Sequence, residues 1–158
     1  MFRRLSLLLA TLAALLTALP TPGLTQDFEQ EVLGPGLYIF QTRVRGATCN
    51  DDFRTGYVTS FFASVDGVPG ERSMQMTLLN SPYWPTWQLK IDPDGQIAGI
   101  IKIDGDGPRA SRESRFSAKK DSNRFTGVGS RSYWSQISGQ WRRCTVHFDV
   151  LLRRFDVN

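Results

Sequence analysis

The residues that carry most enzymatic and metal chemistry are nearly absent from this chain. Its 158 residues include one histidine, His147, and two cysteines, Cys49 and Cys144. A single histidine excludes zinc sites that need two or three histidine ligands. The C-x-x-C, G-x-S-x-G, Walker and G-x-G-x-x-G motifs are all missing. We therefore expect no metal and no cofactor, and we treat an enzyme as the minority hypothesis.

The one candidate pair for acid-base chemistry is His147 with Asp149. The two residues are two positions apart on an expected strand, so they share a face and are able to interact. A general base needs a nucleophile or a substrate group within hydrogen-bond reach, and the sequence places none beside this pair. A solvated surface histidine is the favoured interpretation. A hydrolase or isomerase built on the pair is the alternative.

An apolar run of the roughly 20 residues that a membrane-spanning helix needs is also missing. The apolar run at residues 5–19 covers 15 residues and follows Arg3 and Arg4. A positive segment followed by a short apolar run is typical of a secretory signal peptide. We predict that residues 1–26 are removed, without fixing the cleaved bond. Residues 27–158 then form a single periplasmic or secreted domain that has no membrane span.

A strong net charge is absent once the signal peptide is removed. Residues 27–106 contain 6 Lys or Arg against 11 Asp or Glu, and residues 107–158 contain 11 Lys or Arg against 4 Asp or Glu. The net charge of residues 27–158 is therefore +2. Such a low charge on an exported chain argues against a nucleic-acid partner. The basic second half either steers an acidic partner or simply faces solvent, and we favour solvent.

Two cysteines in an exported chain most economically form one intramolecular disulfide. A bond between Cys49 and Cys144 would close a loop that spans most of the mature domain. Two free thiols or an intermolecular bridge are the alternatives.

Alternation of apolar and polar residues is abundant, whereas helix signals are nearly absent. Cys144, Val146, Phe148, Val150 and Leu152 fall on one face of an extended segment, as in a half-buried strand. The same pattern predicts eight strands, at residues 37–45, 57–65, 72–79, 87–92, 97–103, 114–119, 125–133 and 141–152.

The segments between the expected strands are short and rich in turn residues. Residues 92–95 and 104–107 each resemble part of a calcium loop, but they lack the full ligand ladder and the distal glutamate, so we interpret both as turns. Short connections favour an antiparallel meander, and closure removes its open edges. The sequence therefore predicts an all-β fold: a single antiparallel up-and-down β-barrel of about eight strands, with a β-sandwich as the alternative.

In architecture and size this prediction resembles the lipocalin, fatty-acid-binding and avidin barrels. The resemblance implies only a lipocalin-like or avidin-like architecture. The lipocalin G-x-W motif near the first strand is replaced here by Gly34-Pro35-Gly36.

All four tryptophans lie in two stretches, residues 81–87 and 132–141, which we interpret as loops that lead into strands. Tryptophan and tyrosine combine a large apolar area with a polar group, which suits ligand pockets and protein interfaces. We expect Trp87 and Trp141 to plug the two barrel ends. Trp84 and Trp134 are the expected exposed pair, and they form an aromatic rim if the two loops share an end.

Met74 and Met76 lie on one apolar strand face, where plain core is favoured over the lining of a cavity. An eight-stranded barrel is either filled by side chains or holds one small ligand. We predict an exported protein that binds a small apolar or aromatic ligand in the barrel or at a Trp/Tyr-rich mouth. The alternative is a protein-interaction module, such as an inhibitor of an exported enzyme or an accessory subunit of an envelope complex. The candidate ligand-binding residues are Tyr83, Trp84, Trp87, Tyr133, Trp134, Trp141, Met74 and Met76.

Overall fold

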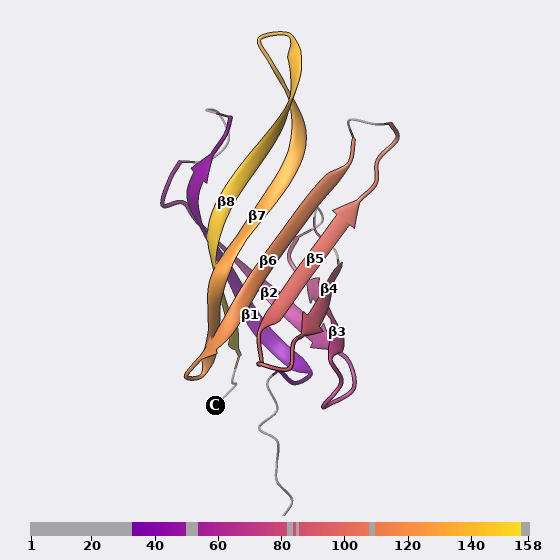
Figure 1. Cartoon of the computed structure of the whole chain (residues 1–158), viewed down its shortest axis with the longest axis vertical. Coiled ribbons are helices and arrows are strands. Elements are labelled where there is room, and N and C mark those ends of the chain that lie inside the picture. The colour runs from indigo at the N-terminus through magenta and orange to yellow at the C-terminus, as the bar shows by residue number, and fades with distance from the viewer. Residues whose placement is uncertain (1–32, 50–53, 82–83, 85, 108–109, 156–158) are drawn as a thin grey trace, which may run out of the picture. The chain divides into compact units, whose positions relative to one another are not determined.

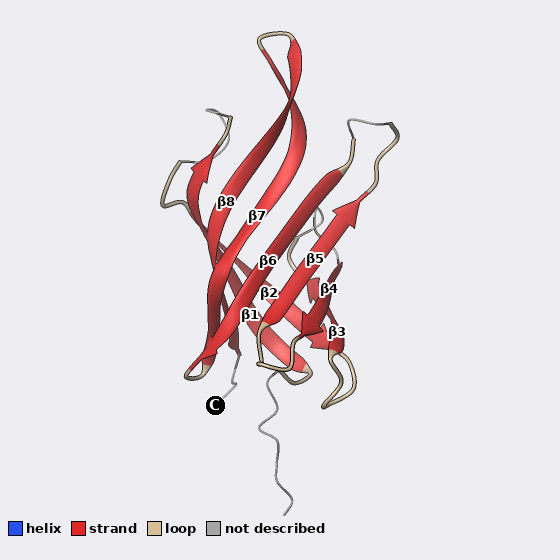
Figure 2. Ribbon diagram, in the orientation of Figure 1, coloured by secondary structure: helices blue, strands red, loops and turns tan. Residues whose placement is uncertain are grey.

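The computed structural model describes residues 33–49, 54–81, 84, 86–107 and 110–155. The predicted signal peptide and Tyr83 lie outside these residues. The described residues contain strands and no helix, as Figure 2 shows. Accordingly, the described part of the chain offers no helix that is long and apolar enough to cross a membrane.

The eight strands form one closed antiparallel barrel. Each strand pairs with the next in the sequence, and the last pairs with the first (Figure 1). The predicted up-and-down barrel is therefore confirmed, and the sandwich alternative is wrong. The strands are β1 (Gly36–Ala47), β2 (Val58–Asp66), β3 (Ser73–Leu78), β4 (Thr86–Ile91), β5 (Ile97–Ile103), β6 (Arg112–Asp121), β7 (Arg124–Ile137) and β8 (Gln140–Arg154).

Burial alternates clearly along strands such as β3 and β8, whereas most of β7 is half-buried without alternation. Met74 and Met76 are 2% and 0% exposed, which confirms the core interpretation for both. Aromatic rings fill the centre: the ring centroid of Phe40 lies 5.3 Å from that of Phe116 and 5.7 Å from that of Trp87. Burial of these side chains is the main source of stability of the barrel.

The stretch at residues 132–141 is not the loop that the sequence suggested. β7 continues to Ile137 and β8 begins at Gln140, so only Ser138 and Gly139 form the turn. Both turn residues have positive φ, 50° and 78°, as a tight two-residue hairpin requires. The paired ends of this hairpin extend beyond the other strands (Figure 1).

The predicted disulfide between Cys49 and Cys144 is present, and the two Cα atoms lie 5.5 Å apart. It joins the segment just after β1 to β8. Beside it, the Thr145 N–H donates to Thr48 Oγ1 at 2.8 Å, and the Thr48 N–H donates to the Thr145 carbonyl at 2.9 Å. The bond fits a chain that is exported to an oxidising compartment.

Position 127 on β7 requires glycine, because the backbone of the neighbouring strand β6 approaches it closely. A Cβ atom at this position would overlap the carbonyl oxygen of Ser117 and the Cα of Ala118 on the neighbouring strand. We expect Gly127→Ala to lower the free energy of unfolding by about 1–3 kcal/mol, because backbone cannot move aside as a side chain can. Urea denaturation of the purified protein measures the change.

Gly46→Ala is the matched control for this prediction. A Cβ at Gly46 would meet no atom within 4 Å, and Gly46 lies in a strand as Gly127 does. Equal destabilisation by both substitutions would contradict the proposed backbone overlap.

Candidate functional site

The two aromatic stretches meet at one end of the barrel. In an up-and-down barrel the connections after β1, β3, β5 and β7 share an end, and the two stretches belong to the connections after β3 and β7. A pocket of about 550 Å³ opens there, and we call it the mouth pocket. Its lining residues are Tyr57, Thr59, Phe61, Asn80, Ser81, Trp84, Arg112, Arg131, Tyr133 and Trp134.

The structure brings three of the predicted residues together in the mouth pocket: Trp84, Tyr133 and Trp134. Trp84 packs on the core, with its ring centroid 6.4 Å from that of Trp87. Met74 and Met76 belong to the packed core and do not line this pocket.

Two expectations about the tryptophans are wrong. Trp141 does not plug a barrel end, because its side chain is 46% exposed near the tip of the β7–β8 hairpin. Trp84 and Trp134 are half-buried rather than exposed, because both line the mouth pocket. Trp87 is buried, as expected, but it lies among the core aromatics.

A small cavity lies beneath the mouth pocket and shares Phe61, Trp84 and Arg131 with it. Its volume is about 20 Å³, which is enough for roughly one water molecule. The barrel interior at this level is therefore filled by side chains. This geometry favours a ligand at the mouth over a ligand deep inside the barrel.

Two polar groups beside these hollows have no hydrogen-bond partner among the described residues. The indole N–H of Trp87, which lines the small cavity, is buried and makes no hydrogen bond. The hydroxyl of Tyr133, which lines the mouth pocket, is also buried without a partner. A buried polar group without a partner costs about 1–3 kcal/mol. An acceptor atom on a bound molecule would remove this cost.

The mouth pocket carries positive charge. Arg112 and Arg131 line it, and none of the described residues that line it is Asp or Glu. The pocket therefore offers aromatic faces, two guanidinium groups and an unpaired hydroxyl. Such a combination suits an aromatic molecule that carries a hydrogen-bond acceptor.

The candidate list from the sequence missed several residues of the mouth pocket. Phe61 and Thr59 lie on the same face of β2 as the buried Ala63 and Val65, but the sequence did not show which barrel end they face. Arg131 was missed because it was treated only as part of a basic segment. Its position two residues before Tyr133 on β7 places both on the same strand face. The signal that could have identified Arg131 as a pocket residue was an arginine on an inward strand face.

His147 and Asp149 lie on the outer face of β8, and both are exposed. Asp149 forms an ion pair with Arg45, with 3.6 Å between Oδ1 and Nε. Such an exposed pair contributes little to stability. Within the described residues, no group of three or more His, Cys, Asp or Glu is arranged to hold a metal ion.

The fold and the site together define a disulfide-bonded, eight-stranded antiparallel barrel with an aromatic, cationic mouth. Comparison with known proteins adds no closer assignment: no protein-family model, no curated protein and no solved structure matches this chain.

Proposed function

We propose that this protein is an exported, periplasmic or secreted, binding protein whose mouth pocket takes a small apolar or aromatic molecule. The observation that carries the proposal is the convergence of Trp84, Tyr133 and Trp134 around a hollow of about 550 Å³. Ligand pockets in proteins are typically about 300–1,000 Å³, apolar, and equipped with a few polar groups.

The polar groups at this end of the barrel indicate the chemical class of the expected ligand. The unpaired hydroxyl of Tyr133 and the unpaired indole N–H of Trp87 are both donors. A ligand that carries an oxygen acceptor would satisfy at least the hydroxyl while its ring packs against Trp84. A ring system with one or two oxygen atoms therefore fits better than a plain hydrocarbon.

The proposal is tested with 2-naphthol, a neutral aromatic molecule with one oxygen, by isothermal titration calorimetry. We expect saturable binding by the wild type. Trp84→Ala is expected to raise Kd about tenfold, because it removes one aromatic wall of the pocket. Quenching of tryptophan fluorescence in the wild type provides an independent signal.

Trp141→Ala is the comparison variant, because Trp141 is exposed and does not line the mouth pocket. Its Kd for 2-naphthol should equal that of the wild type. Thermal melts of both variants establish that they remain folded. Absence of binding by the folded wild type to 2-naphthol and a panel of related phenols and aromatic acids would contradict the proposal, as would equal effects of the two variants.

The second candidate function is a protein-interaction module, such as an enzyme inhibitor or an envelope-complex subunit. Exposed aromatic side chains favour it: Trp141 is 46% exposed, and Phe62 and Phe155 are 50% and 39% exposed with edge-to-face rings. A pull-down from envelope extract compares the wild type with Trp84→Ala/Trp134→Ala and Phe62→Ala/Phe155→Ala. Equal recovery of every protein by all three would count against this candidate.

A further inference from the structure

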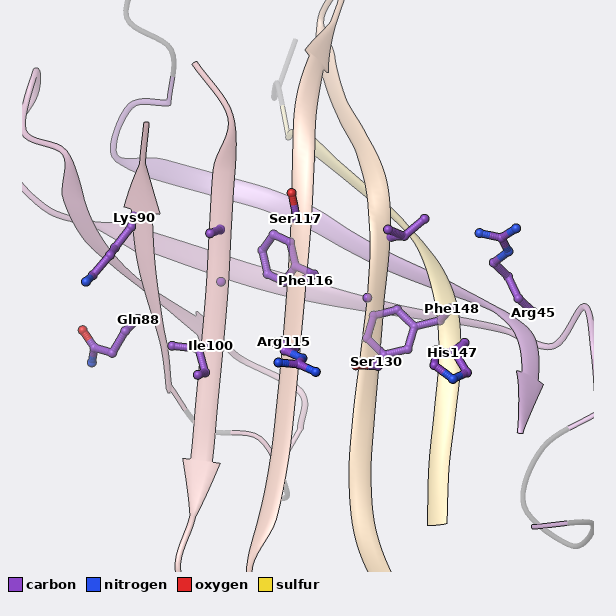
Figure 3. A pocket seen from close by; sticks show the side chains of 14 residues that line it. Arg45, Gln88, Lys90, Ile100, Arg115, Phe116, Ser117, Ser130, His147 and Phe148 are labelled. Atoms are coloured by element: carbon purple, nitrogen blue, oxygen red, sulfur yellow. The ribbon is translucent and has the colours of Figure 1, made fainter. Parts of the chain in front are cut away.

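A second hollow, of about 720 Å³, lies on the outer face of the barrel wall and shares no lining residue with the mouth pocket. We call it the outer cleft. It crosses β4 to β8, from Lys90 on one side to His147 and Arg45 on the other, and Figure 3 shows it from close by. Outward-facing residues such as Arg115 and Ser117 alternate along the strands with core residues such as Phe116, so the cleft lies on the outside of the barrel, although Phe116 and Phe148 also line it.

The register of the strands explains why this face is hollow. Lys90 pairs with Ala98, Ala98 pairs with Ser117, and Ser117 pairs with Val128. Val128 in turn pairs with Asp149, so the shorter side chains of Ala98, Ser117 and Val128 lie between Lys90 and Asp149. Five adjacent strands span about 19 Å at roughly 4.8 Å per interval.

The floor of the outer cleft is apolar although it faces solvent. Ile100 and Val128 are 40% and 50% exposed, and Ala98 and Gly99 lie beside them. An exposed apolar floor of this kind is unfavourable in water unless something covers it.

Cationic side chains line the outer cleft. Arg45, Lys90 and Arg115 line it, and none of the described residues that line it is Asp or Glu. Figure 3 places Arg115 between Lys90 and Arg45. Lys90 and Arg115 form no ion pair with any described residue, whereas Arg45 pairs with Asp149. At least two cations are therefore available to an incoming anion.

We propose that the outer cleft binds a free anionic amphiphile, with one apolar chain along the floor and an acidic head group at Arg115 or Lys90. The apolar floor would bind the chain and the cationic side chains would bind the head group, so an amphiphile uses both features of the cleft. A concave cleft of this volume accommodates a single chain, whereas the flat surface of a membrane would leave the floor uncovered. This site does not depend on the function proposed for the mouth pocket.

The proposal is tested by fluorescence titration with dansyl-undecanoate, a fatty-acid analogue, and with the corresponding dansyl-undecylamine. The wild type should bind one equivalent of the anion saturably and bind the cation at least about tenfold more weakly, because the charge at the rim then repels the probe. The affinity for the anion should fall as salt is added.

Variants locate the binding. Val128→Asp places a negative charge on the apolar floor, and we expect it to raise Kd for dansyl-undecanoate about tenfold or more. Lys90→Glu/Arg115→Glu should have a similar effect and should remove the preference for the anion. Val58→Asp is the matched control, since Val58 is 46% exposed on β2 and lines neither hollow. Its Kd should be unchanged.

Three results would overturn the proposal. The first is equal loss of binding in Val128→Asp and Val58→Asp, when thermal melts show that both are folded. The second is loss of dansyl-undecanoate binding in Trp84→Ala but not in Val128→Asp, which would move the amphiphile to the mouth pocket. The third is binding to anionic vesicles without binding to the monomeric probe, which would indicate a membrane surface instead. Failure of 2-naphthol to bind leaves this test unaffected.

Discussion

Phe40→Ala is expected to lower the free energy of unfolding by about 3–5 kcal/mol, the range seen when a buried phenylalanine is truncated. Phe40 is 1% exposed and lies at the centre of the aromatic core. Its ring centroid is within 6.4 Å of that of Phe61, 5.7 Å of that of Trp87 and 5.3 Å of that of Phe116. Truncation would leave a cavity that these rigid rings cannot collapse to fill.

Urea denaturation followed by near-ultraviolet circular dichroism measures the loss, and Phe62→Ala provides the matched control. Phe62 lies on the neighbouring strand β2, in register with Ile39, but points outward and is 50% exposed. We expect its truncation to cost about 1 kcal/mol or less, mainly through the lost ring contact with Phe155. Similar losses for the two variants would mean that the inward and outward faces are assigned wrongly.

Removal of the disulfide is the second large effect. We expect Cys49→Ala/Cys144→Ala to lower the free energy of unfolding by about 4–5 kcal/mol, because the bond closes a loop across a separation of 95 residues. Most of this effect lies in the unfolded chain, which the bond holds more compact. In a domain with a typical stability of about 5–15 kcal/mol, such a loss is large.

The melting temperature of the double variant, measured beside that of the wild type with and without a reducing agent, checks this prediction. The reduced wild type should melt close to the double variant, because both lack the same cross-link. The ladder of β1 and β8 and the hydrogen bonds between Thr48 and Thr145 should keep the barrel closed without the bond. A double variant with the same melting temperature as the oxidised wild type would contradict the predicted stabilisation by the disulfide.

The strands were the most predictable part of this protein. A period of two is a local property of the chain, so the alternation from Cys144 to Leu152 identified both β8 and its inward face. The hairpin turn at Gly139 was harder to predict, because tyrosine, tryptophan and serine near a glycine are compatible with a loop as well as with a strand. Pairing with Trp141 and Gln140 decided that Gln136 and Ile137 belong to β7.

The candidate site was only partly predictable. The clustering of tryptophan in the sequence identified Trp84 and Trp134 as candidates, and both line the mouth pocket. The sequence singled out Trp141 in the same way, yet Trp141 is exposed, because it pairs with Gln136 near the tip of the β7–β8 hairpin, two residues from the turn. Arg131 and Phe61 contribute to the pocket from separate strands, and no local pattern shows which strand ends meet.

By itself, the sequence determined a meander of about eight strands, because alternation and turn residues are local properties. It favoured closure and the pairing of Cys49 with Cys144 over a β-sandwich and free thiols, and the structure decided both in that direction. Only the tertiary structure decided that the interior is filled, that two aromatic stretches share one mouth, and that a cationic cleft lies outside the barrel. These features depend on strand register and side-chain volume across several strands. Register and packing are set by contacts between residues that are distant in the sequence, and local sequence patterns do not specify these contacts.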